Sequence, residues 1–140
     1  MHRLSPGTVV YHDLRTEELC PELELVPAAV VVARVLSHPT PTRITCDAGS
    51  KALAAEAGDP CAVALGHPEL EAQGPNEEHL PFRVASGERL ERGTLLSLFP
   101  RHVCPTVNLA DEALLFDEGR FVAAVPVAAR GHELLPASEV

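Results

Sequence analysis

The chain has 140 residues, with 11 Lys or Arg against 20 Asp or Glu and a formal net charge of −9. A chain of this size makes one ordinary domain, and its acidic balance makes it a poor candidate for binding nucleic acid or an anionic membrane surface. The longest apolar run, residues 26–33, includes Pro27 and is far shorter than the roughly 20 apolar residues of a membrane span.

Several short apolar segments alternate with Gly, Pro and Asp turns, and we expect each of them to form a strand. They cover residues 8–11, 28–37, 43–46, 61–65, 80–84 and 95–99. Segment 28–37 is rich in valine and apolar almost throughout, so we expect it to be the central strand and to be buried on both faces. Segments 113–116 and 121–127 flank a turn with Gly119, which predicts a hairpin.

The segments between these strands give little room for helix, because 13 prolines and nine glycines interrupt the chain. Residues 50–57 contain good helix formers behind a serine suited to an N-cap, and they predict one short helix. Residues 12–27 predict a loop with one helical turn at 16–19, and residues 66–79 predict a long acidic loop. The expected fold is mainly β: one domain over residues 1–140, a small β-barrel or sandwich with one short helix.

Four cysteines stand at positions 20, 46, 61 and 104, and no pair of them has the spacing of a CxxC motif. Nothing marks a route of export, so we expect reduced thiols and a cytoplasmic protein. Cys20 and Cys61 are interpreted as core or surface thiols. The histidines at positions 2, 12, 38, 67 and 132 have no partner at the spacing of metal ligands, and we expect them at the surface.

Segment 100–108 carries the most distinctive chemistry, because His102 and Cys104 follow directly after the predicted strand 95–99. On a continuing strand these side chains would share one face about 6.6 Å apart, a gap that one divalent ion can bridge. An imidazole with a thiolate suits zinc better than magnesium or manganese. The spacing also arises by chance, and Cys104 is then an ordinary thiol at the end of a strand.

Four sequence blocks together resemble one known family. They are TCDAGSKAL at 45–53, EEH at 77–79, PRHVCPTVN at 100–108 and ARG at 129–131. In this order they resemble the C-terminal domain of the D-serine dehydratase and D-threonine aldolase family, over residues 5–131. The chain departs from the family pattern at Arg101, where the family usually has Asn, and at Asn76, where it tends to have Ser. It also has Gly93-Thr94 where the family has Gly-Asp.

The resemblance implies a pyridoxal-phosphate enzyme with an alanine-racemase-like layout, in which a (β/α)8 barrel carries the cofactor and a C-terminal β domain closes the site. It implies that His102 and Cys104 match the His-x-Cys pair that holds a divalent metal ion, usually zinc in the dehydratases. No barrel-sized series of strands and helices precedes this domain, and the only lysine, Lys51, lies in the Asp-Ala-Gly-Ser-Lys loop. Pyridoxal phosphate is therefore expected only through a missing barrel domain or subunit.

Four further residues are candidates for an active-site loop. Relatives with the alanine racemase fold place a loop that Cys46 and Asp47 match near the partner subunit's cofactor; alternatively, Asp47 makes an Asx-turn to its own backbone. Glu78 and His79 have three interpretations. They contact and orient the metal ligands, they act as acid–base groups, or they belong to a solvated acidic loop.

Two hypotheses for the function follow. The chain is either the metal-binding part of a D-amino-acid lyase, inactive alone and needing a barrel partner, or a stand-alone metal-binding or remnant domain without catalysis. In the first case the expected partners are the barrel, a D-amino-acid substrate and, in addition, a second copy in a homodimer. A domain built to dock exposes an apolar patch, and a self-sufficient one should not.

Overall fold

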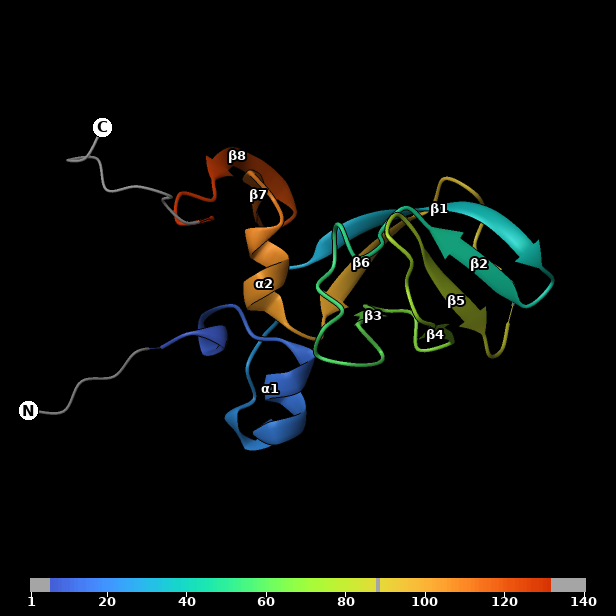
Figure 1. Ribbon diagram of the computed structural model, residues 1–140, viewed down its shortest axis with the longest axis horizontal. Helices are drawn as coiled ribbons and strands as arrows, with labels where there is room; N and C mark the ends of the chain where they lie inside the picture. The colour runs from blue at the N-terminus through green and yellow to red at the C-terminus, as the bar shows by residue number, and fades with distance from the viewer. Residues whose placement is uncertain (1–5, 88, 132–140) are drawn as a thin grey trace, which may run out of the picture.

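The computed structural model describes residues 6–87 and 89–131, and its largest unit is a six-stranded antiparallel sheet (Figure 1). Across the sheet the strands run in the order β3-β6-β1-β2-β5-β4. The edge strands β3 and β4 contact each other, so the sheet curls into a nearly closed barrel. This confirms the predicted mainly β fold with a small barrel. The strands are β1 (Val31–Thr40), β2 (Arg43–Cys46), β3 (Ala62–Ala64), β4 (Leu70–Ala72), β5 (Leu80–Val84) and β6 (Leu95–Pro100).

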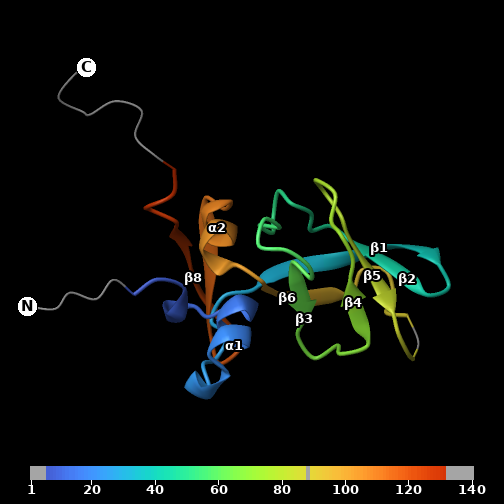
Figure 2. The same cartoon turned by 60° about the horizontal axis from the view of Figure 1, so that its bottom comes forward.

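A second group of elements lies at one end of the molecule, away from β2, β4 and β5 (Figures 1 and 2). It contains helix α1 (Leu14–Leu19), helix α2 (Val103–Asn108) and the predicted hairpin, formed by β7 (Glu112–Asp117) and β8 (Arg120–Pro126). Two 3-10 turns, Thr8–Val10 and Pro21–Leu23, flank α1. No helix within residues 6–87 and 89–131 has both the length and the apolar character needed to cross a membrane.

Strand β1 is central, as predicted, because it pairs with β6 through its first half and with β2 through its second half. It is not buried on both faces. Ala33 and Val35 are 2% and 1% exposed, whereas Val32 is 61% exposed. The residues alternate because one face of β1 lines the barrel interior and the other faces outward. The continuous run of valines therefore reflects the preference of β-branched residues for strands, and not double burial.

The barrel interior is filled by aliphatic side chains and one ring, as the scarcity of aromatic residues requires. Its largest fully buried members include Phe82, Ile44, Leu53, Leu80, Leu96 and Leu98. All four cysteines carry free thiols: Cys46 and Cys61 belong to this core, Cys20 is half-buried and Cys104 is exposed.

The predicted strand at residues 8–11 is wrong, because this segment forms a 3-10 turn. The amide of Val10 donates to the Gly7 carbonyl at 3.0 Å, and the amides of Tyr11 and His12 both donate to the Thr8 carbonyl. Valine and tyrosine favour strands, but no strand among the described residues pairs with this segment, so local bonds satisfy its backbone instead.

The predicted helix at residues 50–57 is also wrong. The amides of Ala52 and Leu53 both donate to the Gly49 carbonyl, which closes a single turn. The next amide, Ala54, donates instead to the Thr106 hydroxyl on α2, so a tertiary contact overrides helix propensity. Residues 66–79 are likewise not all loop, because β4 forms there against β5. The turn expected at 16–19 is part of α1.

Candidate metal centre

His102 and Cys104 lie at the start of α2 and not on one strand face, so that part of the prediction is wrong. His102 has an extended backbone (φ −134°, ψ 104°) and directly precedes the helix, and Cys104 is in its first turn. Pro105 follows Cys104 without strain, because amides in the first helical turn need no intrahelical partner. The backbone thus changes from extended to helical between the two candidate ligands.

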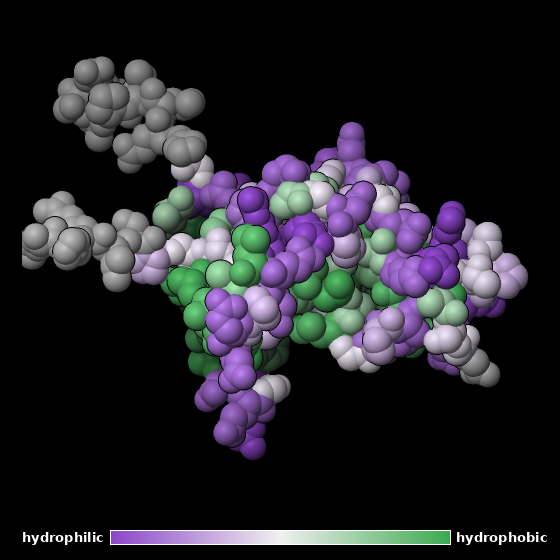
Figure 3. Space-filling view, turned by 90° about the horizontal axis from the view of Figure 1, so that it is seen from below, coloured by the Kyte–Doolittle hydropathy of each residue, from purple (hydrophilic) through white to green (hydrophobic). Residues whose placement is uncertain are grey.

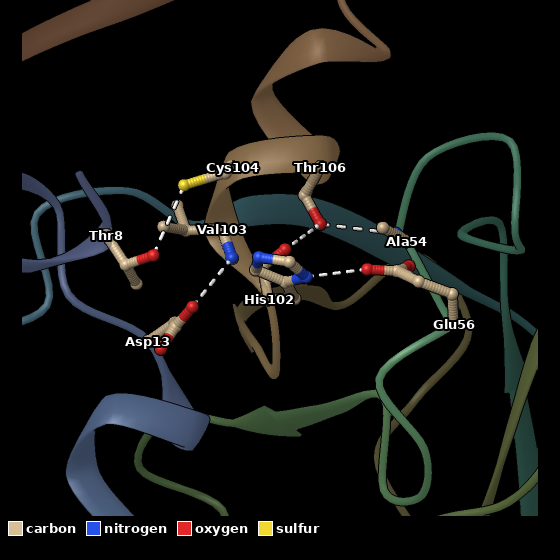
Figure 4. Close-up of polar contacts among 8 residues, drawn as sticks. All are labelled: Thr8, Asp13, Ala54, Glu56, His102, Val103, Cys104 and Thr106. Atoms are coloured by element: carbon tan, nitrogen blue, oxygen red, sulfur yellow. Dashed lines mark hydrogen bonds and ion pairs between the residues drawn. The ribbon is translucent and has the colours of Figure 1, made fainter. Parts of the chain in front are cut away.

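The two side chains have different neighbours (Figure 4). Nδ1 of His102 lies 2.6 Å from Oε1 of Glu56, and Sγ of Cys104 lies 3.3 Å from Oγ1 of Thr8. The His102 side chain is 29% exposed and Cys104 is exposed, so both are accessible to an incoming ion. Within residues 6–87 and 89–131 no three His, Cys, Asp or Glu residues are grouped to hold a metal. The structure brings His102 together with Glu56, which the sequence analysis did not single out.

The donor chemistry at this turn fits a divalent ion. An ionised carboxylate only accepts hydrogen bonds, so Nδ1 of His102 donates to Glu56, and in the neutral ring the lone pair is on Nε2. Metal-binding histidines commonly donate their second ring N–H to a carboxylate in this way. The accessible thiol of Cys104 adds a soft donor, which favours zinc over the ions that prefer oxygen.

Asp13 connects the N-terminal helix to this turn, and it is fully buried. Its Oδ1 accepts the amide of Thr16 at 2.8 Å, which caps α1, and its Oδ2 accepts the amide of Val103 at 3.0 Å. His102 makes no side-chain cap for α2, so Asp13 supplies that bond from another part of the chain. Because Val103 stands between the two candidate ligands, Asp13 fixes the backbone that carries both of them.

His12 is 2% exposed, so its predicted surface position is wrong. Its backbone has a positive φ of 64°, its ring centroid lies 5.4 Å from that of Phe99, and its Nε2 lies 2.5 Å from Oε2 of Glu17. The ring is thus part of the packing between the N-terminal segment and β6. His38 and His67 are half-buried, and the histidines at positions 2 and 132 lie outside the described residues.

Arg101, which the sequence analysis singled out as a departure from the resemblance, links three parts of the chain. Its Nη1 and Nη2 each lie 2.8 Å from a carboxylate oxygen of Glu18 in α1, and its Nε donates to the Pro60 carbonyl at 2.7 Å. The hydrogen bond from the guanidinium lowers the pKa of Glu18. Arg101 therefore joins α1, the loop before β3 and the end of β6.

The two loops predicted to form an active-site region lie against each other. The amide of Ser50 donates to the Asn76 carbonyl at 2.9 Å, and the amide of Lys51 donates to the Glu77 carbonyl at 3.1 Å. Gly49 permits this approach: a Cβ there would lie 2.4 Å from backbone atoms of Asn76 and Glu77. The blocks at 45–53 and 77–79, far apart in the chain, thus form one local structure.

Cys46 and Asp47 enter this structure from the end of β2. Burial, and then the charge of Asp47, raises the pKa of the Cys46 thiol to about 12, so the thiol stays protonated at neutral pH. Oδ1 of Asp47 accepts the backbone N–H of Arg34 at 2.5 Å, and the Asp47 amide donates to the Arg34 carbonyl. Asp47 therefore bonds across to β1 and not to its own backbone.

Glu78 and His79 form the other side of the local structure. The Asn76 side chain accepts the backbone N–H groups of both residues, at 2.9 and 2.7 Å. Glu78 is 61% exposed, and its Oε1 lies 2.5 Å from Nζ of Lys51. This hydrogen bond lowers the pKa of Glu78 and raises that of Lys51, so both groups are charged at neutral pH.

The barrel and the turn at α2 place the chain in a known class of domains. An alanine racemase-like protein from Idiomarina loihiensis shares the fold, with a TM-score of 0.66 at 17% identity over 86% of this chain and 36% of that one. Residues 28–116 match the family model described as Putative serine dehydratase domain. The chain belongs to this family, which confirms the resemblance drawn from its sequence blocks.

Individual relatives agree with this assignment. The chain is 38% identical over 102 residues to a D-threonine aldolase of Arthrobacter sp; the match covers 72% of this chain but only 26% of that protein. The crystal structure of the D-threonine aldolase from Filomicrobium marinum matches with a TM-score of 0.69 at 28% identity, over 76% of this chain and 29% of the other. D-threo-3-hydroxyaspartate dehydratase from Delftia sp. HT23 shares the fold, with a TM-score of 0.68 at 23% identity, over 90% and 38%.

Proposed function

We propose that the chain is the metal-binding C-terminal β domain of a pyridoxal-phosphate-dependent D-amino-acid lyase of the D-serine dehydratase or D-threonine aldolase type. The observation that carries the proposal is the turn at α2. There His102 is paired with Glu56 through Nδ1, and an accessible Cys104 follows two residues later. Membership of the family supports it.

His102 would hold the metal through Nε2 and Cys104 would hold it through Sγ. Two protein ligands leave coordination positions open, as catalytic sites do. When bound, the ion acts as a Lewis acid that polarises the β-hydroxyl group of a substrate. Solved forms of D-threo-3-hydroxyaspartate dehydratase include a metal-free one with a cysteine replaced by alanine, and another with the histidine two positions earlier replaced. These substitutions have the same two-residue spacing as His102 and Cys104.

Pyridoxal phosphate does not fit the residues of this chain. A Schiff base requires a neutral lysine amine, and Lys51 is the only lysine. Its Nζ lies 2.5 Å from Glu78 and 3.3 Å from Glu77, and hydrogen bonds to these carboxylates raise its pKa. The lysine is thus held as an ammonium ion, so the cofactor would come with a partner barrel.

The hairpin of β7 and β8 is the surface best suited to that partner. Every residue of β7 is exposed, and apolar side chains on both faces of the hairpin are accessible to solvent: Leu114, Leu115, Phe116, Phe121 and Val122 are 50–64% exposed. Figure 3 shows apolar residues gathered at this end of the molecule. A two-stranded hairpin with two apolar faces is marginal in water, so burial against another domain would stabilise it.

The occupant we propose for this surface is the cofactor barrel, on a longer chain or a separate subunit. The chain spans about a quarter of the length of the D-threonine aldolase it matches, which leaves a barrel-sized remainder in that relative. The exposed apolar hairpin also favours the hypothesis that the chain is part of a larger enzyme over the hypothesis that it is a self-sufficient domain. For the whole enzyme we also propose a homodimer, a D-amino-acid substrate and a cytoplasmic location.

We expect His102→Ala and Cys104→Ala each to weaken zinc binding by about tenfold or more, because each removes one of two ligands. Zinc is titrated into each purified chain in competition with a chromophoric chelator. Cys20→Ala and His67→Ala serve as matched controls and should compete like the wild type. If all five proteins compete equally, the metal site is not at this turn.

The chain alone is expected to have no lyase or racemase activity. Its only lysine is paired with carboxylates, so no amine is available for the cofactor. The assay adds pyridoxal phosphate, zinc, and D-serine or D-threonine to the purified chain, with a full-length D-threonine aldolase as positive control. Turnover by the 140-residue chain alone would contradict the need for a barrel.

A further inference from the structure

We propose that Glu56 is a positioning residue for the candidate ligand His102, a role that rests on the proposed function. The carboxylate holds the ring with Nδ1–H donating, so that Nε2 carries the lone pair for the metal. The contact is 2.6 Å between Nδ1 of His102 and Oε1 of Glu56. Glu56 comes from the loop between β2 and β3, 46 positions before His102.

The hydroxyl of Thr106 fixes this loop to the start of α2 (Figure 4). Thr106 is 6% exposed. Its Oγ1 donates to the His102 carbonyl at 2.8 Å and accepts the amide of Ala54 at 3.1 Å. One hydroxyl therefore joins the backbone of the ligand residue to the backbone two positions before Glu56. This bridge places the carboxylate within reach of the ring and does not depend on Glu56 itself.

The loop that carries Glu56 is also anchored to the barrel core by the residue that precedes Ala54. The side chain of Leu53 is fully buried in the core, and its amide donates to the Gly49 carbonyl at 2.9 Å. A glutamate side chain has three rotatable bonds, and anchoring the backbone beside it lowers the entropy lost when its carboxylate is held in place. The contact between Glu56 and His102 therefore rests on an organised loop.

The chemistry of imidazole decides which role Glu56 has. Nδ1 and Nε2 point in divergent directions, so a carboxylate that binds Nδ1 is on the wrong side of the ring to share an ion with Nε2. Glu56 is then not a ligand. A carboxylate on Nδ1–H fixes the tautomer and the orientation of the ring and makes Nε2 a better donor.

The first test measures zinc affinity by chelator competition. Glu56→Ala should weaken binding by about 10- to 100-fold, the usual effect of losing such a partner. Glu56→Gln keeps an acceptor without its charge and should lose less, and Thr106→Val should also lose less because Glu56 remains. Glu91→Gln removes an exposed carboxylate elsewhere and should bind like the wild type. Binding by Glu56→Ala within twofold of the wild type overturns the inference.

The second test needs no metal and distinguishes positioning from loop packing. In 15N-histidine spectra of the neutral ring, His102 of the wild type should carry its proton on Nδ1, and Glu56→Ala should show a mixture of tautomers. An unchanged tautomer in Glu56→Ala overturns the inference. If His102→Ala binds zinc like the wild type, the proposed function fails and the Glu56 role fails with it. If only Glu56→Ala binds like the wild type, the Glu56 role alone fails.

Discussion

Replacement of Asp13 by alanine is expected to lower the free energy of unfolding by about 3 kcal/mol, because bonds from a buried carboxylate to backbone amides are among the stronger ones in a protein. The substitution removes the cap of α1 and leaves the buried amide of Val103 without its acceptor. It also frees the backbone between His102 and Cys104. Zinc affinity should therefore fall even where the variant remains folded.

The measurement is urea unfolding, together with the chemical shift of the Val103 amide. Asp13→Asn keeps one acceptor oxygen and should lose about half as much stability. Asp111→Ala removes a carboxylate that is 82% exposed and pairs with Arg130, and it should cost no more than about 1 kcal/mol. If Asp13→Ala and Asp111→Ala lower the free energy of unfolding equally, the bonds from Asp13 to α1 and α2 do not stabilise the fold as proposed.

Gly49→Ala is expected to cost roughly 3 kcal/mol, the upper range for overpacking a site that cannot relax. A Cβ there would lie 2.4 Å from the Asn76 carbonyl oxygen and from the Glu77 carbonyl group. These are backbone atoms, so no side chain can rotate away. The loops must separate, which breaks the bonds from Ser50 and Lys51 to the opposite backbone.

Thermal unfolding of Gly49→Ala and Gly74→Ala measures this cost against a matched control. A Cβ at Gly74 meets no atom of the described part of the chain within 4 Å, so that variant should unfold at nearly the temperature of the wild type. The amides of Ser50 and Lys51 should also exchange with solvent faster in Gly49→Ala. If both variants unfold alike, the contact between the two loops is looser than the structure shows.

Local patterns predicted the elements that short runs of residues specify. Strands 43–46 and 80–84 agree with β2 and β5, because β-branched and apolar residues bounded by turn residues define them. The hairpin followed from the glycine between two apolar runs. The four sequence blocks that resemble the family are also short runs of adjacent residues. The resemblance to the family could therefore be drawn before the fold was known.

The errors lie where a distant partner decided the local structure. Ser50 to Ala57 has the composition of a helix, but Ala54 bonds to Thr106, 52 positions away. His12 looked like a surface residue until the turn before α1 directed its ring against Phe99. His102 and Cys104 were considered on a continuing strand, but helix α2 begins at Val103, whose amide finds its acceptor in Asp13.

The sequence by itself determined the fold class and the family, and it singled out two candidate metal ligands, since these depend on composition and on short runs of adjacent residues. Only the tertiary structure decided which side chains contact the turn that carries these two candidate ligands. Glu56 and Asp13 are 46 and about 90 positions away from the turn they contact. No periodicity or spacing along a chain records such a pair, because the contact exists only after the barrel has closed and brought the loop and α1 to the start of α2.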